Sequence, residues 1–371
     1  MKINILYRQF FDLYGIDLMI GGVETYILNL STVFINNGYE VNIYQFAEKN
    51  FERKYMEANV IGVCPCGKFE RLYKERIKKM IIESYKRSDV EKDILIFATD
   101  YDIVATKYKK VIAIQHGVGW DIHHECRKYS LMPFLFGVKN LMIAYACRNK
   151  YFKCSKIVCV DYNFVNWYRT NIHEDLNYSV IPNFSELSLN NSKKEKKNVS
   201  IIFARRFQTY RGTKVFADAI VDILKSYTNI QVTIAGEGPE ETYLREKLSG
   251  YSNVTFTKFF PHESLKIHSE YDIAIVPSTG SEGTSLSLLE AMAAGCAVIC
   301  TDVGGLTNII INGHNGIIVR PNSNDLQKAV KLLIDDCALR SRLSECAYET
   351  VKDSFDIKEW SKKWMEIVDK C

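Results

Sequence analysis

The chain has 371 residues, which is too long for one ordinary hydrophobic core and favours two α/β domains. Hydrophobic residues make up 47% and charged residues 25%, values typical of a folded globular protein, so the composition excludes a disordered chain. The net charge of +4 suits an anionic ligand or a membrane surface and gives little support for nucleic acid as a partner.

The cysteines and the apolar stretches exclude several other classes of protein. Most of the eleven cysteines are scattered among apolar or helical patterns, as small buried hydrophobes would be. Cys64 and Cys66 lack a second Cys or His pair at ligand spacing, so no zinc site is predicted. The start of the chain has no signal-peptide pattern, and the longest apolar stretch, 131–147, is interrupted by Pro133 and Lys139. We therefore expect a cytoplasmic protein without a transmembrane helix.

Short apolar runs alternate with longer helical patterns in the first half of the chain, which is typical of βαβ units around a parallel sheet. The runs cover residues 3–7, 41–46, 94–98, 111–115 and 157–160. They predict a Rossmann-like domain over residues 1–184. A polar, lysine-rich stretch over residues 185–198 then breaks the pattern, and we interpret it as an interdomain linker.

The same rhythm restarts after the linker and predicts a second Rossmann-like domain over residues 199–355. Its apolar runs cover residues 199–204, 232–235, 254–257, 273–276, 297–300 and 317–319. Ligands bind at the carboxyl ends of the strands in such doubly wound sheets, so two in tandem predict a shared central cleft. The final stretch, 356–371, is expected to form a separate helix with Trp360 and Trp364 on one apolar face. The periodicity leaves open whether this helix packs back on the first domain.

The most informative segment, STGSEGTSLSLLEAMAAG, follows a predicted strand. Gly283 permits a tight turn, Thr284 or Ser285 can cap the next helix, and the amides at the helix start suit a diphosphate. Glu282 before the helix and Glu290 within it can accept hydrogen bonds from different sugar hydroxyls. A loop residue and a solvated helix residue are the ordinary alternatives. Function is favoured because Glu290 stands in an apolar run, where an unpartnered carboxylate is costly.

Three arginines gather after the first strand of the second domain, in the segment RRFQTYRG. Guanidinium groups match phosphate oxygens and neutralise a departing nucleoside diphosphate. We expect Arg206 and Arg211 to act in this way. A basic, solvated turn is the alternative, and it is more plausible for Arg205 alone than for all three arginines.

Two glycine-rich loops also follow strands. Gly236 and Gly238 precede a helix and are candidates for a wall of the nucleoside site, although Gly-x-Gly alone is weak evidence. Gly22 opens the first crossover helix, where backbone can approach a phosphate or sugar closely. A flexible turn explains Gly22 equally well.

His116 ends an apolar run on the cleft side of the first domain, and this placement favours a role although a lone histidine more often packs or lies on the surface. Asp121 is a candidate to orient it or to bind acceptor. Asp100 and Asp102 match an Asp-x-Asp pattern that some sugar transferases use for a divalent cation. We reject this role because the arginines and amides already suit a diphosphate, and we expect no metal and no cofactor.

These motifs together resemble a known family. Glu282 and Glu290 in SEGTSLSLLEAMAAG, with the following AVICTDVGGLTNIIINGHNGIIVRP, are similar to the C-terminal signature of family 4 retaining glycosyltransferases, glycosyl transferases group 1, which have the GT-B fold. RRFQTYRG, IAGEGP, VIPNF and GGVE resemble the family's other landmarks. The resemblance covers nearly the whole chain and is most specific in the second domain.

The resemblance implies a role for each matching residue. Arg206 and Arg211 would hold the diphosphate, Glu290 the ribose and Glu282 the donor sugar, with His116 facing the transferred sugar from the first domain. The amides near the donor sugar would be those of Gly283, Thr284 and Ser285. Retention would follow from attack on the same face of the sugar, with the leaving phosphate taking the acceptor proton.

Two positions depart from the family pattern. Arg211 replaces the usual lysine, which keeps the charge but exchanges a compact ammonium for a forked donor. Thr284 and Ser285 replace the usual small and aromatic residues after Glu-Gly, so the surroundings of the donor sugar differ. The identity of the donor sugar stays open.

A membrane contact is a further hypothesis. The segment 71–87 carries seven basic and two acidic residues and places apolar side chains near one helical face, as an anionic membrane would require. The segment 131–145 is a second candidate. A domain helix with a solvated basic face is the slightly favoured alternative for 71–87.

The expected function is therefore retaining, metal-independent transfer of a sugar from a nucleotide-diphosphate sugar to a saccharide or lipid-linked saccharide. Synthesis of a bacterial surface polysaccharide, at the inner face of the cell membrane, is the expected setting. Two alternatives stay open: a catalytically silent GT-B subunit that binds a nucleotide sugar, and a nucleotide-sugar epimerase. The presence of both glutamates, the arginines and His116 favours the transferase.

Overall fold

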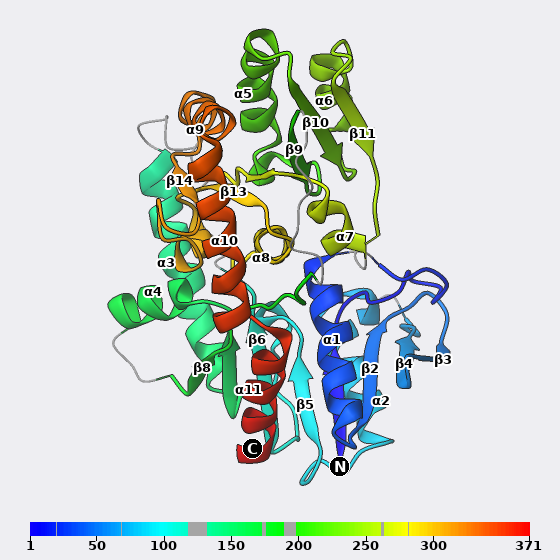
Figure 1. Ribbon diagram of the computed structural model, residues 1–371. Helices are drawn as coiled ribbons and strands as arrows, with labels where there is room; N and C mark the ends of the chain where they lie inside the picture. The colour runs from blue at the N-terminus through cyan, green and yellow to red at the C-terminus, as the bar shows by residue number, and fades with distance from the viewer. Residues whose placement is uncertain are drawn as a thin grey trace.

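The computed structural model describes residues 1–19, 21–67, 69–117, 132–172, 176–188, 198–260, 263–280 and 282–371. Figure 1 shows two α/β halves, each built around its own sheet. The predicted α/β class with two Rossmann-like sheets is confirmed.

The first half is built around an eight-stranded sheet. Its strands are β1 (Lys2–Leu6), β2 (Glu40–Phe46), β3 (Phe51–Tyr55), β4 (Ala58–Val63), β5 (Ile94–Phe97), β6 (Lys110–Gln115), β7 (Lys156–Cys159) and β8 (Tyr178–Val180). They lie in the order β3-β4-β2-β1-β5-β6-β7-β8, and all neighbours are parallel except β3 and β4. The β3–β4 hairpin was not predicted from the sequence. The edge strand β3 (FERKY) is largely polar, and its residues alternate between half-buried and exposed, so it is not a continuous apolar run.

Helices cover both faces of the first sheet. They are α1 (Gly22–Asn36), α2 (Tyr73–Tyr85), α3 (Met132–Tyr151), α4 (Tyr162–Ile172) and α11 (Ile357–Lys370). Successive side chains of a strand point to opposite faces, so Ile3 and Ile5 of β1 pack with α1 and α11, whereas Leu6 packs with α2, α3 and α4. Both faces of the sheet are therefore buried, as a parallel sheet requires.

The second half is built around a six-stranded parallel sheet. Its strands are β9 (Val199–Ala204), β10 (Ile230–Ala235), β11 (Val254–Thr257), β12 (Ile273–Val276), β13 (Ala297–Thr301) and β14 (Ile317–Val319), in the order β11-β10-β9-β12-β13-β14. The surrounding helices are α5 (Thr213–Ser226), α6 (Glu241–Leu248), α7 (Ser264–Ser269), α8 (Leu286–Ala293), α9 (Ser323–Asp335) and α10 (Cys337–Ser354). The strand order reverses between β9 and β12, where such sheets bind ligands.

The last helix, α11, returns to the first half, and Figure 1 shows it below α10 with both chain termini at the same end of the molecule. Trp364 is fully buried and donates from Nε1 to the hydroxyl of Tyr26 at 2.8 Å. The chain crosses between the two halves twice, near Ser185 and near Phe355. These two crossings are adjacent, because Ser185 N donates to Phe355 O at 3.0 Å. Of the predicted linker, residues 189–197 lie outside the described residues.

The helix α2 uses its apolar face in the fold. Ile77, Met80 and Ile81 are buried and pack with the first sheet, whereas Lys74 and Lys78 are exposed and the guanidinium of Arg76 packs over the ring of Phe46. This face is not available to a membrane, so the alternative of a domain helix with a solvated basic face describes the segment. Within the described part of the chain, no helix has both the length and the apolar character needed to cross a bilayer.

Candidate active site

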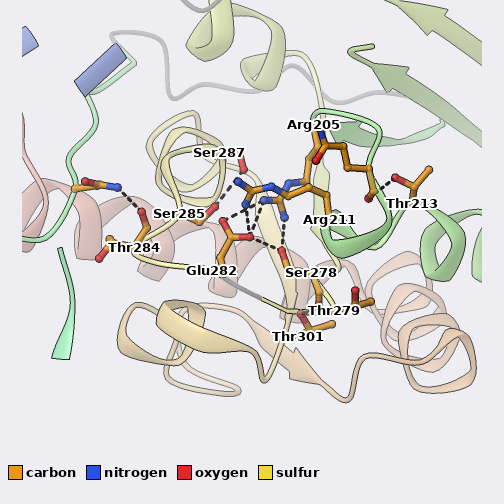
Figure 2. Close-up of polar contacts among 12 residues, drawn as sticks. Arg205, Arg211, Thr213, Ser278, Thr279, Glu282, Thr284, Ser285, Ser287 and Thr301 are labelled. Atoms are coloured by element: carbon orange, nitrogen blue, oxygen red, sulfur yellow. Dashed lines mark hydrogen bonds and ion pairs between the residues drawn. The ribbon is translucent and has the colours of Figure 1, made fainter. Parts of the chain in front are cut away.

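The loop between β12 and α8 holds a compact ionic cluster around Glu282. Arg205 donates from Nη2 to both carboxylate oxygens, at 3.2 and 3.0 Å, and Arg211 pairs with Oε2. The hydroxyl of Ser278 donates to the same oxygen at 2.6 Å and accepts from Nη1 of Arg205 at 2.8 Å. Figure 2 shows these four side chains, from the β9 and β12 loops, pointing toward one another.

Burial and charge together fix the state of this cluster. Only 4% of the side chain of Glu282 and 4% of that of Arg205 is exposed, against 29% for Arg211. Burial alone would raise the pKa of Glu282, but the two guanidinium groups outweigh it and lower that pKa to about 2. One carboxylate between two guanidiniums leaves a net positive charge, and Arg211 is its accessible end.

The structure places Arg205 and Arg206 differently from the sequence prediction. Arg205 had the weakest expectation of a role, yet it is the buried partner of Glu282. Arg206 is exposed, and its side chain is not part of the cluster. Alternation past the end of β9 accounts for the difference, because Arg205 and Phe207 point inward and Arg206 points outward. This alternation is the signal that could have identified Arg205.

Glycines let the loops around the cluster approach one another. Gly212 has a φ of +78°, and a Cβ at this position would lie 1.7 Å from the carbonyl oxygen of Pro277. The N-terminus of α5, next to Arg211, therefore packs directly against the end of β12. A Cβ on Gly236 would lie 2.1 Å from Arg205 O, so this glycine is explained by packing alone. A donor contact of Gly236 and Gly238 stays a prediction.

The loop after Glu282 also touches the first half of the chain. Thr284 donates from its hydroxyl to Val160 O, and Asn183 Nδ2 donates to Thr284 O at 2.5 Å. A Cβ on Gly117 would lie 3.3 Å from the amide nitrogen of Gly283. The side chain of Thr284, predicted near the donor, thus joins the two halves, and its hydroxyl is already engaged.

The N-termini of α8 and α1 approach each other at the boundary between the halves. Ser285 is the N-cap residue of α8, and its hydroxyl lies 3.2 Å from that of Ser287 instead of capping the helix. Gly22 is the first residue of α1, and a Cβ on it would lie 3.7 Å from Leu286 Cδ1. Two helix starts, each with amides that favour an anion, therefore lie close together.

Glu290 lies on α8, beyond the first turn, and its side chain is half-buried. Ser264 on α7 donates to Oε2 at 2.7 Å, and burial raises the pKa of Glu290. The sequence argument required a hydroxyl or cationic partner for this carboxylate, and Ser264 supplies the hydroxyl.

His116 directly follows β6, at the carboxyl end of the strands of the first sheet. Its Nε2 lies 2.8 Å from Ala98 O, and because a carbonyl only accepts, Nε2 carries a proton. Burial lowers the pKa of His116 to about 4, so the ring is neutral near pH 7 and Nδ1 is an acceptor. The ring of Tyr26 packs edge-on against the His116 ring, with 5.0 Å between the ring centroids. Trp364 of α11 donates a hydrogen bond to the hydroxyl of Tyr26.

The two aspartates of the Asp-x-Asp pattern have separate partners. Asp100 accepts from Tyr151 on α3 at 2.7 Å, and Asp102 accepts from Tyr73 on α2 at 2.5 Å. Burial raises the pKa of Asp100 to about 6. Among the described residues, no group of three or more acidic, His or Cys side chains is arranged to hold a metal. Asp121 lies outside the described residues.

Comparison with known proteins gives both a family and a fold. Residues 185–350 match the family model for glycosyl transferases group 1. An uncharacterized glycosyltransferase of Methanocaldococcus jannaschii is 24% identical, with 95% of this chain and 95% of that protein covered.

Two solved structures resemble the whole chain. Sucrose-phosphate synthase from Thermosynechococcus elongatus has a TM-score of 0.77 at 16% identity and covers 100% of this chain and 98% of that one. Anabaena HepE, solved in complex with UDP and glucose, has a TM-score of 0.74 at 15% identity and covers 100% of each chain. These likenesses show the GT-B fold, and together with the family match they place the chain in glycosyl transferases group 1, as a GT-B glycosyltransferase that takes its sugar from a nucleotide-sugar donor.

Proposed function

We propose that this enzyme transfers a sugar, with retention of its anomeric configuration, from a nucleotide-diphosphate sugar to a saccharide or lipid-linked saccharide. The observation that carries the proposal is the ionic cluster of Glu282 with Arg205 and Arg211, at the loop that leads into α8. Its net positive charge and the adjacent helix start suit a diphosphate without a metal ion.

The two guanidiniums of the cluster have different tasks in this proposal. Arg205 is almost fully buried and stays on Glu282, whereas Arg211 is partly exposed and turns to the diphosphate when donor binds. Glu282 then accepts a hydrogen bond from a hydroxyl of the donor sugar. Arg206 is adjacent to Arg205 in the sequence, and its side chain is exposed. It is the second cation for the diphosphate in this proposal.

The rest of the donor contacts the segment from Gly283 to Glu290. The amides of Gly283, Thr284 and Ser285 lie at the helix start and favour the negative charge of the leaving group. Glu290 accepts from the ribose, in addition to its bond from Ser264. Gly236 and Gly238 contribute to the wall of the nucleoside site.

The first half contributes His116 and Gly22 and binds the acceptor. The neutral ring of His116 accepts a hydrogen bond at Nδ1 from the transferred sugar. The acceptor oxygen bonds to the anomeric carbon, the bond from that carbon to the phosphate oxygen breaks, and the departing phosphate takes the acceptor proton. No protein nucleophile takes part.

The donor base and the setting complete the proposal. UDP is the nucleotide in the HepE complex, so UDP-sugars are the first donors to test. Synthesis of a bacterial surface polysaccharide, in the cytoplasm at the inner face of the cell membrane, is the setting that we propose.

The test is release of nucleoside diphosphate. A thermal-shift panel of UDP-, GDP- and ADP-sugars first identifies the donor, and release is then measured with and without saccharide acceptors. We expect release that depends on acceptor and an α-linked product from an α-linked donor. A changed sugar without release would indicate an epimerase, and binding without either reaction would indicate a silent subunit.

A further inference from the structure

The helix α3 has a buried edge and an exposed edge, and both are apolar. Ala144, Cys147 and Tyr151 are buried against the first half of the molecule. Tyr151 also fixes the C-terminal end of the helix, because its hydroxyl donates to buried Asp100. A helix that is apolar on opposite sides uses only one of them for its own fold.

The exposed edge of α3 carries large apolar side chains. Those with the greatest exposure are Phe134 (71%), Met142 (69%) and Leu135 (60%), and the others are Val138, Leu141 and Tyr145. At about 100° per residue, these six exposed positions together cover roughly 120° of the helix surface, on the side away from the buried residues. Such a row of neighbouring apolar side chains marks an interaction surface, whereas single exposed apolar residues do not.

The flanks of this edge are basic. The helix contains Lys139, Arg148 and Lys150 and no acidic residue. By the same angular spacing, Lys139 lies beyond one border of these apolar positions and Arg148 beyond the other, whereas Lys150 donates to Tyr101 O at 3.2 Å. An apolar strip between two basic flanks is the pattern of a helix that lies in the interface of an anionic bilayer.

We propose that the exposed edge of α3 rests on an anionic phospholipid surface. A second copy of the chain fits this edge less well, because a symmetric pair of α3 helices would bring basic flanks together without acidic partners on either helix. The three cations on α3 are consistent with a helix that lies on the bilayer and does not cross it.

The position of α3 links the lipid surface to the acceptor half. Through Tyr151 the helix contacts Asp100, which follows β5 at the same sheet edge as His116. A membrane beneath α3 would therefore bring a lipid-linked acceptor to the half that we propose binds it. This last step depends on the proposed function, whereas the lipid contact itself does not.

Flotation of the full chain with vesicles tests the proposal. We expect binding to vesicles of phosphatidylcholine with phosphatidylglycerol, and much weaker binding to phosphatidylcholine alone. The variant Leu141→Gln/Met142→Gln should bind the anionic vesicles at least about 10-fold less, because two large apolar side chains no longer enter the interface. Lys139→Glu should lower binding by about five-fold or more, and added salt should lower it further.

A matched control is available on α2. Ile82 is 57% exposed, so Ile82→Gln removes an apolar side chain of comparable exposure from a different helix and should float like the wild type. Acceptor-dependent release of nucleoside diphosphate should be unchanged in the α3 variants when the acceptor is water-soluble.

Three results would overturn the proposal: wild-type chain that floats with neither vesicle, α3 variants that float like wild type, or a dimer in light scattering that the α3 variants dissociate. Loss of the release reaction in every chain, with flotation as expected, would instead refute the proposed function and leave the lipid contact standing.

Discussion

The candidate site lies beyond the carboxyl ends of the strands of both sheets, and the two halves differ there in the charge of their side chains. In the second half, Glu282 and two arginines form a buried cluster with one excess positive charge. In the first half, His116 is neutral, and Asp100 and Asp102 are held by tyrosine hydroxyls. A diphosphate is best stabilised by positive charge, whereas an uncharged acceptor does not require it. The difference supports our proposal that the second half binds the diphosphate of the donor and the first half binds the acceptor.

The largest effect is expected from Glu282→Ala. Removal of the carboxylate leaves two guanidiniums without their partner, and breaking a buried pair in this way costs about 3–5 kcal/mol of folding free energy. Turnover should fall at least about 10²-fold. Urea denaturation and steady-state kinetics measure the two effects. Glu349→Gln, which removes an exposed ion pair with Lys352, is the control and should leave the midpoint of urea denaturation nearly unchanged.

The next effect concerns Arg205, the buried guanidinium of the cluster. Arg205→Met should destabilise the fold by about 3–5 kcal/mol and raise the pKa of Glu282, because a neighbouring cation no longer favours the carboxylate. The acid limb of kcat/KM should then move to higher pH, with Arg205→Lys partly restoring it. An unchanged acid limb in Arg205→Met would show that Arg205 does not act through Glu282.

Arg206 separates an effect on donor binding from an effect on folding, because its side chain is exposed. Arg206→Ala should change stability by no more than about 0.5 kcal/mol, as is usual for a surface substitution. If it binds the diphosphate as proposed, turnover should still fall by about 10²-fold. Normal turnover in this variant would assign the diphosphate to Arg211 and the amides of α8 alone.

The smallest effect concerns the charge state of His116. Its pKa is lowered to about 4, whereas the unfolded chain has the ordinary value of 6.5, so protonation favours unfolding. The contribution of His116 to stability is therefore complete above pH 6.5 and falls as the pH drops toward 4. NMR titration of the ring should give a midpoint near 4, and a midpoint near 6.5 would show that the ring is solvated.

Much of the fold could be predicted from the sequence, because buried parallel strands are continuous apolar runs. The predicted segment after β12 is indeed where Glu282 lies, and Ser285 is the N-cap of α8. The β3–β4 hairpin was missed because its edge strand is polar.

The contacts within the site could be predicted less well, because they depend on which side chains turn inward. Arg205 and Arg206 are chemically identical neighbours, and only the alternation with buried Phe207 past the end of β9 distinguishes them. The hydroxyl of Thr284 bonds Val160, which is 124 positions away in sequence, so no local pattern indicates it. The apolar residues of α2 and α3 look alike in sequence, but tertiary packing buries Ile77, Met80 and Ile81 of α2 and leaves a row of large apolar side chains on α3 exposed.

A crystal structure with the identified nucleotide sugar tests the central claim most directly. We predict that the diphosphate lies at the N-terminus of α8, that Arg211 has left Glu282 to bind it, and that Arg205 remains on Glu282. A diphosphate bound elsewhere, with both guanidiniums still on Glu282, would contradict the account.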